Sequence, residues 1–212
     1  MKYSHHFARG VNLGRLAIDL KRQSNLWDRN PCRLSTCGPH HETQDIFLRY
    51  KDERPNLSSG DWRDFCDPHI PDWYQSVDLL PDAKRIALEL MAAVGGEMLG
   101  GVFLYKVDPG KRIYKHTDRG WHPSYFDKFN VCIESNPQAA FVYDDERFTQ
   151  APGDVHFFRN DVDHEVINEG EAPHVILTVC IRIDQGVRVP WSPEGWTMDG
   201  SRHVAAQKQE GE

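Results

Sequence analysis

Seven short apolar or alternating segments, separated by turns and crowded into about 80 residues, constrain the fold of this chain most strongly. Turn-forming Pro, Gly, Asn and Asp residues separate them, as in Asp-Pro-Gly at 108–110 and Ala-Pro-Gly-Asp at 151–154. Short strands at such regular spacing are typical of a β-sandwich or a β-barrel. The sequence therefore predicts a mainly β domain with strands at 102–107, 112–115, 128–134, 139–143, 155–158, 165–168 and 175–183.

Helical patterns precede these strands. Pro81 and Asp82 suit the first turn of a helix, apolar residues then recur at helical spacing to Val94, and Gly95-Gly96 ends the pattern. Residues 10–21 fit helix and strand templates about equally, and their Leu, Ala, Lys and Arg content favours a helix. Residues 23–75 are rich in turn formers except for a strand-like stretch at 45–50. We expect a partly irregular N-terminal extension (1–75) packed on the core, a β domain with its preceding helix (76–200) and a disordered tail (201–212).

Composition limits the class of protein. The chain has 212 residues, with Lys+Arg 25 against Asp+Glu 32 and a net charge of -7, which suits a single globular domain. The acidic balance disfavours charge-driven binding to nucleic acid, although a local basic groove remains compatible with it. Apolar runs are too short to cross a bilayer, and the N-terminus lacks an apolar signal region. Five cysteines cannot all pair, so we expect a reducing, cytoplasmic location.

His116, Asp118 and His164 carry the clearest chemical signal. Side chains two apart on a strand point the same way, so His116 and Asp118 face one cavity. His164 follows 46 residues after Asp118, which leaves room for several strands to return beside the first. Two imidazoles and one carboxylate that leave open positions on the metal are typical of non-haem Fe(II) oxygenases. Spacing alone also fits a hydrogen-bonded His-x-Asp pair, and Cys32, Cys37, His40 and His41 superficially offer zinc ligands in a poor arrangement.

Sequence motifs around these residues favour the metal site over a hydrogen-bonded pair. Pro-Gly shortly before His-Thr-Asp, a strand ending in Asn136-Pro137, and His-Glu-Val-Ile-Asn at 164–168 occur in order. Together they resemble the aspartyl/asparaginyl β-hydroxylase family of Fe(II)/2-oxoglutarate dioxygenases, over about residues 104–183. The resemblance implies a double-stranded β-helix, or cupin-like jelly roll, here with flanking N-terminal helices. It also implies Fe(II) at His116, Asp118 and His164, with 2-oxoglutarate and O2 as co-substrates.

The co-substrate site departs from the family pattern. Members carry an Arg about ten residues after the last metal His, where its planar fork grips a carboxylate, but this chain has His174. Tyr105, Lys128 and Asn130 occupy other positions that the resemblance associates with the co-substrate. An Arg from elsewhere, such as Arg49 or Arg182, is an alternative clamp. The ordinary structural alternatives are an exposed strand face for Lys128 and Asn130, and a strand-start histidine for His174.

The loop after the metal motif offers substrate contacts. Trp121 and Tyr125 follow Asp118 closely, and aromatic rings there suit a flat or apolar group. Arg49, on the strand-like segment 45–50, is a candidate for an anionic group. Each of these residues also has a purely structural interpretation.

The resemblance implies a hydroxylase acting on an amino-acid side chain, either peptidyl or free, with succinate and CO2 as co-products. A nucleobase or nucleotide oxygenase is the alternative enzyme, and it requires a local basic groove. A jelly-roll binding module without turnover is the non-enzymatic alternative. The presence of His174 in place of the family's Arg favours this alternative. We expect no membrane partner, and the sequence leaves the oligomeric state open.

Overall fold

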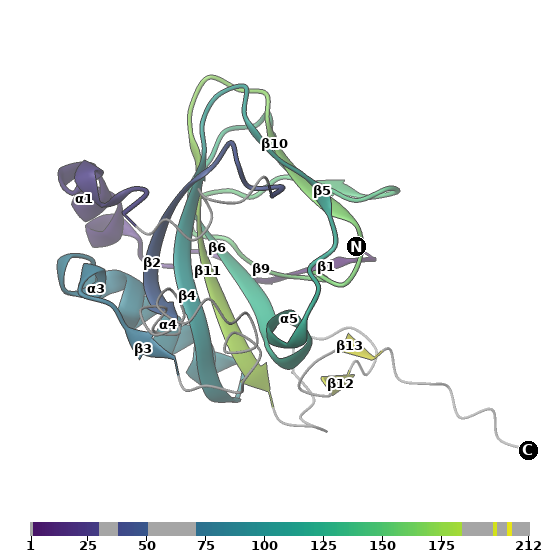
Figure 1. The fold of residues 1–212 in the computed structure, drawn as a ribbon, viewed down its shortest axis with the longest axis horizontal. Coiled ribbons are helices and arrows are strands. Elements are labelled where there is room, and N and C mark those ends of the chain that lie inside the picture. The colour runs from purple at the N-terminus through teal and green to yellow at the C-terminus, as the bar shows by residue number, and fades with distance from the viewer. Residues whose placement is uncertain (1, 30–37, 51–70, 184–196, 199–202, 205–212) are drawn as a thin grey trace, which may run out of the picture.

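A computed structural model describes residues 2–29, 38–50, 71–183, 197–198 and 203–204. Its main body is two antiparallel sheets, seen in Figure 1. The larger sheet has the order β1-β9-β6-β11-β4-β2-β3 and the smaller has the order β5-β10-β7-β8. The strands are β1 (Ser4–Ala8), β2 (Gln44–Tyr50), β3 (Asp72–Trp73), β4 (Gly96–Val107), β5 (Arg112–His116), β6 (Asp127–Glu134), β7 (Ala139–Val142), β8 (Arg147–Phe148), β9 (Val155–Phe158), β10 (His164–Asn168), β11 (His174–Ile183), β12 (Thr197–Met198) and β13 (His203–Val204).

The strand order is that of a jelly roll. Strands distant in sequence are neighbours: β11 lies between β4 and β6, and β10 lies between β5 and β7. The predicted cupin-like jelly roll is confirmed, and each of the seven predicted strands is present. The largest difference is β4, which begins at Gly96 rather than at residue 102. β12 and β13 form a separate pair.

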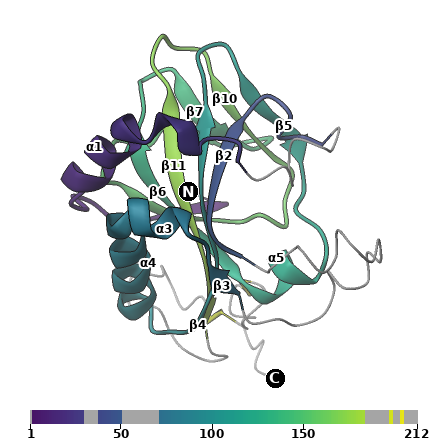
Figure 2. The same cartoon turned by 60° about the vertical axis from the view of Figure 1, so that its left-hand side comes forward.

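The helices are α1 (Gly14–Arg22), α3 (Ser76–Leu79), α4 (Pro81–Ala93) and α5 (Trp121–Tyr125), with a 3-10 turn, η1 (Ser24–Leu26). Figure 2 shows α1, α3 and α4 together on one face of the larger sheet. The two predicted helices are confirmed. Gly95 follows α4 with φ +66°, a left-handed conformation that glycine adopts without strain, and so the helix ends there. None of the described helices is long and apolar enough to span a bilayer.

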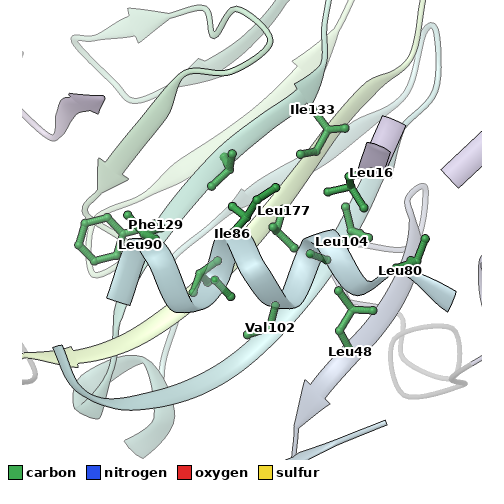
Figure 3. Close-up of a cluster of buried hydrophobic side chains, with 14 of the residues drawn as sticks. Leu16, Leu48, Leu80, Ile86, Leu90, Val102, Leu104, Phe129, Ile133 and Leu177 are labelled. Carbon is green, nitrogen blue, oxygen red and sulfur yellow. The ribbon is translucent and has the colours of Figure 1, made fainter. Parts of the chain in front are cut away.

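Alternation along the strands of the larger sheet separates two cores. Leu104 and Leu177 point to the helix side, where they pack with Ile86 and Leu90 of α4, as Figure 3 shows. Phe103 and Ile176, one position away along the same strands, belong to the second core, which lies between the sheets. Helices thus cover one face of the large sheet and leave its other face to build a cavity with the small sheet.

The N-terminal residues take part in this sheet. β1 pairs with β9, with His6 opposite His156, and β2 pairs with β4. The sequence predicted β2 but not β1, whose polar residues lack a strand pattern. Residues 51–70, and 201–202 and 205–212 of the predicted tail, lie outside the described part of the chain. The division into extension, domain and tail stays a prediction.

Asn136 and Asn168, the asparagines of two sequence motifs, form a hydrogen-bond network between loops. The Asn168 amide nitrogen donates to the Val107 and Ala172 carbonyls at 2.8 and 2.9 Å. Asn136 donates to the Asn168 side-chain oxygen at 2.9 Å and also to the Ala172 carbonyl. The asparagines of the two family-like motifs therefore join loops at one end of the barrel.

We expect Asn168→Ala to lower the free energy of unfolding by about 2–3 kcal/mol, because it removes the donor to the buried Val107 carbonyl and the acceptor of the Asn136 amide. For a chain of this size the melting temperature should fall by roughly 5–10 °C in a thermal unfolding scan. Asn25→Ala, at an exposed position, is the matched control and should change little. An unchanged melting temperature in Asn168→Ala would contradict the stabilising role of these hydrogen bonds.

Candidate functional site

One pocket between the two sheets contains the predicted metal ligands. It encloses about 350 Å³ of space free of atoms, part of it open to solvent. Aromatic and aliphatic side chains line its walls, and polar groups gather in one region. The lining residues are His40, Phe103, Tyr105, Ile113, His116, Asp118, Lys128, Phe141, Phe158, His164, Val166 and Thr178.

Strand pairing brings the three predicted ligands together. His116 ends β5, His164 begins β10, and the two are opposite each other in the antiparallel register. Their ring centroids are 4.5 Å apart. His116 Nε2 is 3.6 Å from Asp118 Oδ1, and one ligand atom from each residue lies within 4.8 Å of the others. The structure therefore places two imidazoles and one carboxylate around one point.

Hydrogen bonds orient both imidazoles. His116 Nδ1 lies 2.7 Å from the Tyr114 carbonyl oxygen, and His164 Nδ1 lies 2.8 Å from the Val162 carbonyl oxygen. Because a carbonyl only accepts, each Nδ1 must donate, which leaves a lone pair on each Nε2. Backbone carbonyls fix metal-binding histidines in this way in many proteins.

The charges of the site also suit a cation. Burial alone would raise the pKa of Asp118, but Lys128, with its ammonium 2.5 Å from Asp118 Oδ2, and the His116 hydrogen bond hold that pKa well below its usual value. Burial lowers the pKa of His164 to about 4, so its ring is neutral at pH 7. A deprotonated carboxylate and a neutral imidazole are the forms that bind metal ions. The donor set therefore fits Fe(II).

Two of the four predicted co-substrate residues line the pocket. Tyr105 and Lys128 belong to its wall, together with Thr178, which the sequence analysis missed. Asn130 is buried nearby, where its side-chain oxygen accepts a hydrogen bond from Thr178 Oγ1 at 2.8 Å. Thr178 shares its face of β11 with His174 and was identifiable by alternation alone.

His174 is not brought to the pocket. It begins β11, is 1% exposed, and its Nδ1 lies 2.9 Å from Ser135 Oγ. Burial lowers the pKa of its ring to about 4. A neutral imidazole gives no fixed charge for a carboxylate, so the structure favours Lys128 over His174 for that role.

Buried His174 should make stability pH-dependent. The unfolded ring binds a proton below about pH 6.5, whereas the folded ring stays neutral to about pH 4, so stability falls as pH drops through this window. Between pH 7.5 and pH 5.0, the free energy of unfolding should fall in both proteins. In His174→Leu the fall should be about 2 kcal/mol smaller than in the wild type, as measured by urea unfolding. Ser135→Ala keeps the histidine and should retain the wild-type slope. Equal slopes in His174→Leu and the wild type would contradict this prediction.

Two of the predicted substrate residues, Tyr125 and Arg49, and the alternative clamp Arg182 lie outside the pocket lining. Arg182 stacks over the Tyr125 ring, with its guanidinium carbon 4.1 Å from the centroid, and also pairs with Glu97 at 2.9 Å. Arg49 lies over the Trp73 ring at 5.2 Å, and its Nε donates to the Leu99 carbonyl at 3.4 Å. None of Tyr125, Arg49 and Arg182 is among the lining residues. The Trp121 side chain lies outside the described part.

His40 is a further pocket residue. Its ring packs edge-on against His116, with centroids 5.0 Å apart, while the neighbouring His41 stacks on Tyr114 at 4.8 Å. The zinc alternative named Cys32, Cys37, His40 and His41, and both cysteines lie outside the described residues. No periodic pattern in residues 38–43 marked His40 as a pocket residue, because this segment is a turn whose position tertiary packing decides.

Comparison with known proteins gives one family match. The model of the aspartyl/asparaginyl beta-hydroxylase family matches residues 41–182. No curated protein sequence matches the chain significantly.

Several solved structures are similar to this chain at low identity. A cupin-superfamily sugar phosphate isomerase from Silicibacter pomeroyi is 19% identical, with 74% of this chain and 69% of that chain covered and a TM-score of 0.37. A cupin domain from Bordetella pertussis is 19% identical, with coverages of 39% and 81% and a TM-score of 0.32. A predicted oxalate decarboxylase from Thermotoga maritima is 18% identical, with coverages of 44% and 71% and a TM-score of 0.32.

Proposed function

The chain belongs to the aspartyl/asparaginyl β-hydroxylase family, and from this premise we propose that it is an Fe(II)- and 2-oxoglutarate-dependent dioxygenase. Its substrate is an amino-acid side chain, in a peptide or free, and the reaction hydroxylates a carbon. The observation that carries the proposal is the convergence of His116, Asp118 and His164 in one pocket. Three protein ligands leave coordination positions open for the reactants.

The three ligands have distinct tasks. His116 and His164 offer their Nε2 lone pairs, and Asp118 supplies the negative charge that a divalent cation requires. Bound Fe(II) supplies the redox chemistry that reduces O2, converts 2-oxoglutarate to succinate and CO2, and hydroxylates the substrate. The carbonyls of Tyr114 and Val162 keep both imidazoles in the tautomer that this binding needs.

Lys128 is our candidate for binding a carboxylate of 2-oxoglutarate. Among the described residues that line the pocket, it alone carries a fixed positive charge. Its ammonium now pairs with Asp118, and a metal ion on Asp118 would weaken that pair and leave the ammonium for a second anion. Tyr105 lies on the same pocket wall and can add a hydroxyl donor, whereas the Thr178 hydroxyl donates to the Asn130 side-chain oxygen.

The remaining wall is apolar. Phe103, Phe141 and Phe158 surround the polar region, together with Ile113 and Val166. Apolar walls exclude water, which strengthens the interaction of Lys128 with an anion and limits side reactions at the reacting carbon. Neither of the alternatives from sequence, a nucleobase oxygenase or a binding module without turnover, is favoured by a specific contact among the described residues.

Anaerobic titration of the full chain with Fe(II) and then 2-oxoglutarate tests this function. We expect a visible charge-transfer band that appears only when both are present. Admission of O2 should then release succinate, and amino acids or peptides that are substrates should accelerate it. Metal binding without the band or succinate would contradict the proposal and leave the binding module as the explanation.

A further inference from the structure

A second His/Asp/His cluster lies at the edge of the larger sheet, away from the β5–β10 ligands. His6 of β1 is directly opposite His156 of β9, and Asp154 immediately precedes β9. One ligand atom from each of the three residues lies within 4.8 Å of the others. His6 Nε2 is 3.3 Å from Asp154 Oδ1. The cluster therefore repeats the donor composition of the first site.

His156 is the buried member of the cluster. It is 3% exposed, its ring stacks on Phe148 at 4.9 Å, and its Nδ1 has no hydrogen-bond partner within the described part of the chain. A buried ring nitrogen without a partner is costly, and a bound ion or water is the usual compensation. Burial also lowers the pKa of this ring to about 4, so it is neutral at pH 7.

Asp154 is held in place by its turn. Its Oδ2 accepts the Ala151 N–H at 3.0 Å, and its own N–H donates to the Ala151 carbonyl at 2.9 Å. Gly153 has φ +89°, a left-handed conformation suited to glycine, which allows this tight turn. The other carboxylate oxygen, Oδ1, is directed to His6. The turn thus presents one oxygen to the cluster without further rearrangement.

We propose that His6, Asp154 and His156 form a second metal site, which binds a Zn²⁺-class transition-metal ion and fastens β1 to β9. Two imidazoles and one carboxylate are ligands that Zn²⁺ accepts, with water in a fourth position. This site is independent of the proposed hydroxylase chemistry, because it shares no residue with the first site.

Binding requires His6 to turn. The His6 and His156 rings are stacked at 4.6 Å with 7° between their planes, and parallel rings do not aim both lone pairs at one point. His6 lies on an edge strand and is partly exposed, and its rotation breaks the hydrogen bond of its Nε2 with the Ala8 carbonyl oxygen at 3.0 Å. Arg9 must also leave, since its guanidinium lies 3.3–3.4 Å from both His6 ring nitrogens. Arg9 therefore competes with the metal ion for this position.

Zn²⁺ and Co²⁺ titration of the untagged full chain tests the site, in a His116→Ala/His164→Ala background that removes the first site. We expect this background to bind one equivalent of Co²⁺ with visible absorption bands, and Zn²⁺ to displace it. His6→Ala and Asp154→Asn, added separately, should each weaken binding at least tenfold. His5→Ala, the adjacent histidine on β1, is the matched control and should bind as the background does.

Three further measurements distinguish a true metal site from damage to the fold. Asp154→Asn keeps an oxygen for the Ala151 N–H, so its circular dichroism spectrum should match the background. Arg9→Gln should tighten Zn²⁺ binding severalfold, because it removes the competing cation. Zn²⁺ should raise the melting temperature of the background but not of His6→Ala. A background that binds no ion, or equal binding in all variants, would overturn the proposal.

Discussion

Replacing His116 or His164 with alanine is expected to weaken Fe(II) binding by more than about 100-fold and to abolish 2-oxoglutarate turnover. Each imidazole supplies one of three protein ligands, and neither strand can offer a substitute at the same place. Fe(II) binding is measured anaerobically, and turnover is measured as succinate released. Circular dichroism and thermal unfolding should show a folded protein, because the apolar cores on both faces of the larger sheet remain intact.

His41→Ala is the control for these two variants. This residue is also a histidine next to the pocket, but its ring stacks on Tyr114 and is not among the lining residues. It should retain Fe(II) binding and turnover close to the wild type. Wild-type turnover in either His116→Ala or His164→Ala would refute the assignment of these residues as metal ligands.

Lys128→Met is expected to raise the apparent dissociation constant of 2-oxoglutarate by about 10- to 100-fold. A charge-assisted hydrogen bond contributes roughly 1.5–3 kcal/mol, which corresponds to this range. Fe(II) affinity should stay the same or improve, because the variant removes an ammonium that competes for Asp118. Lys128→Arg restores a cation and should recover part of the 2-oxoglutarate affinity. The charge-transfer titration gives both constants.

Comparison with two other residues makes the Lys128 result specific. Lys106→Met removes a cation from β4 whose ammonium lies over the Trp27 ring at 5.0 Å, outside the pocket, and should leave the constant unchanged. His174→Ala should have little effect, because His174 lies outside the pocket lining. The opposite result would be a large loss of 2-oxoglutarate affinity in His174→Ala and none in Lys128→Met. It would show that His174, at the position that the family resemblance implies, binds the carboxylate instead of Lys128.

Local sequence features determined much of the fold. Short apolar runs bounded by turns, at 102–107 and 175–183, identified strands whose alternate residues face two different cores. Pro81 and Gly95-Gly96 bounded α4 to within one residue, since their backbone restrictions act locally. The same local logic put His116 and Asp118 on one side of the chain. Spacing along the sequence also suggested His164 as the third ligand, and the resemblance to a family then supported all three residues and added the jelly roll.

Tertiary structure decided what no local pattern encodes. The pairing of β10 with β5 brings His164 opposite His116, and the position of a turn brings His40 beside them. Packing placed Arg49 over Trp73 and buried His174 beside Ser135, so both lie outside the pocket lining despite their suggestive chemistry. β1 has no strand pattern of its own and exists through pairing with β9. Propensity and alternation depend on neighbours along the chain, whereas a site depends on contacts between strands that only the folded core brings together.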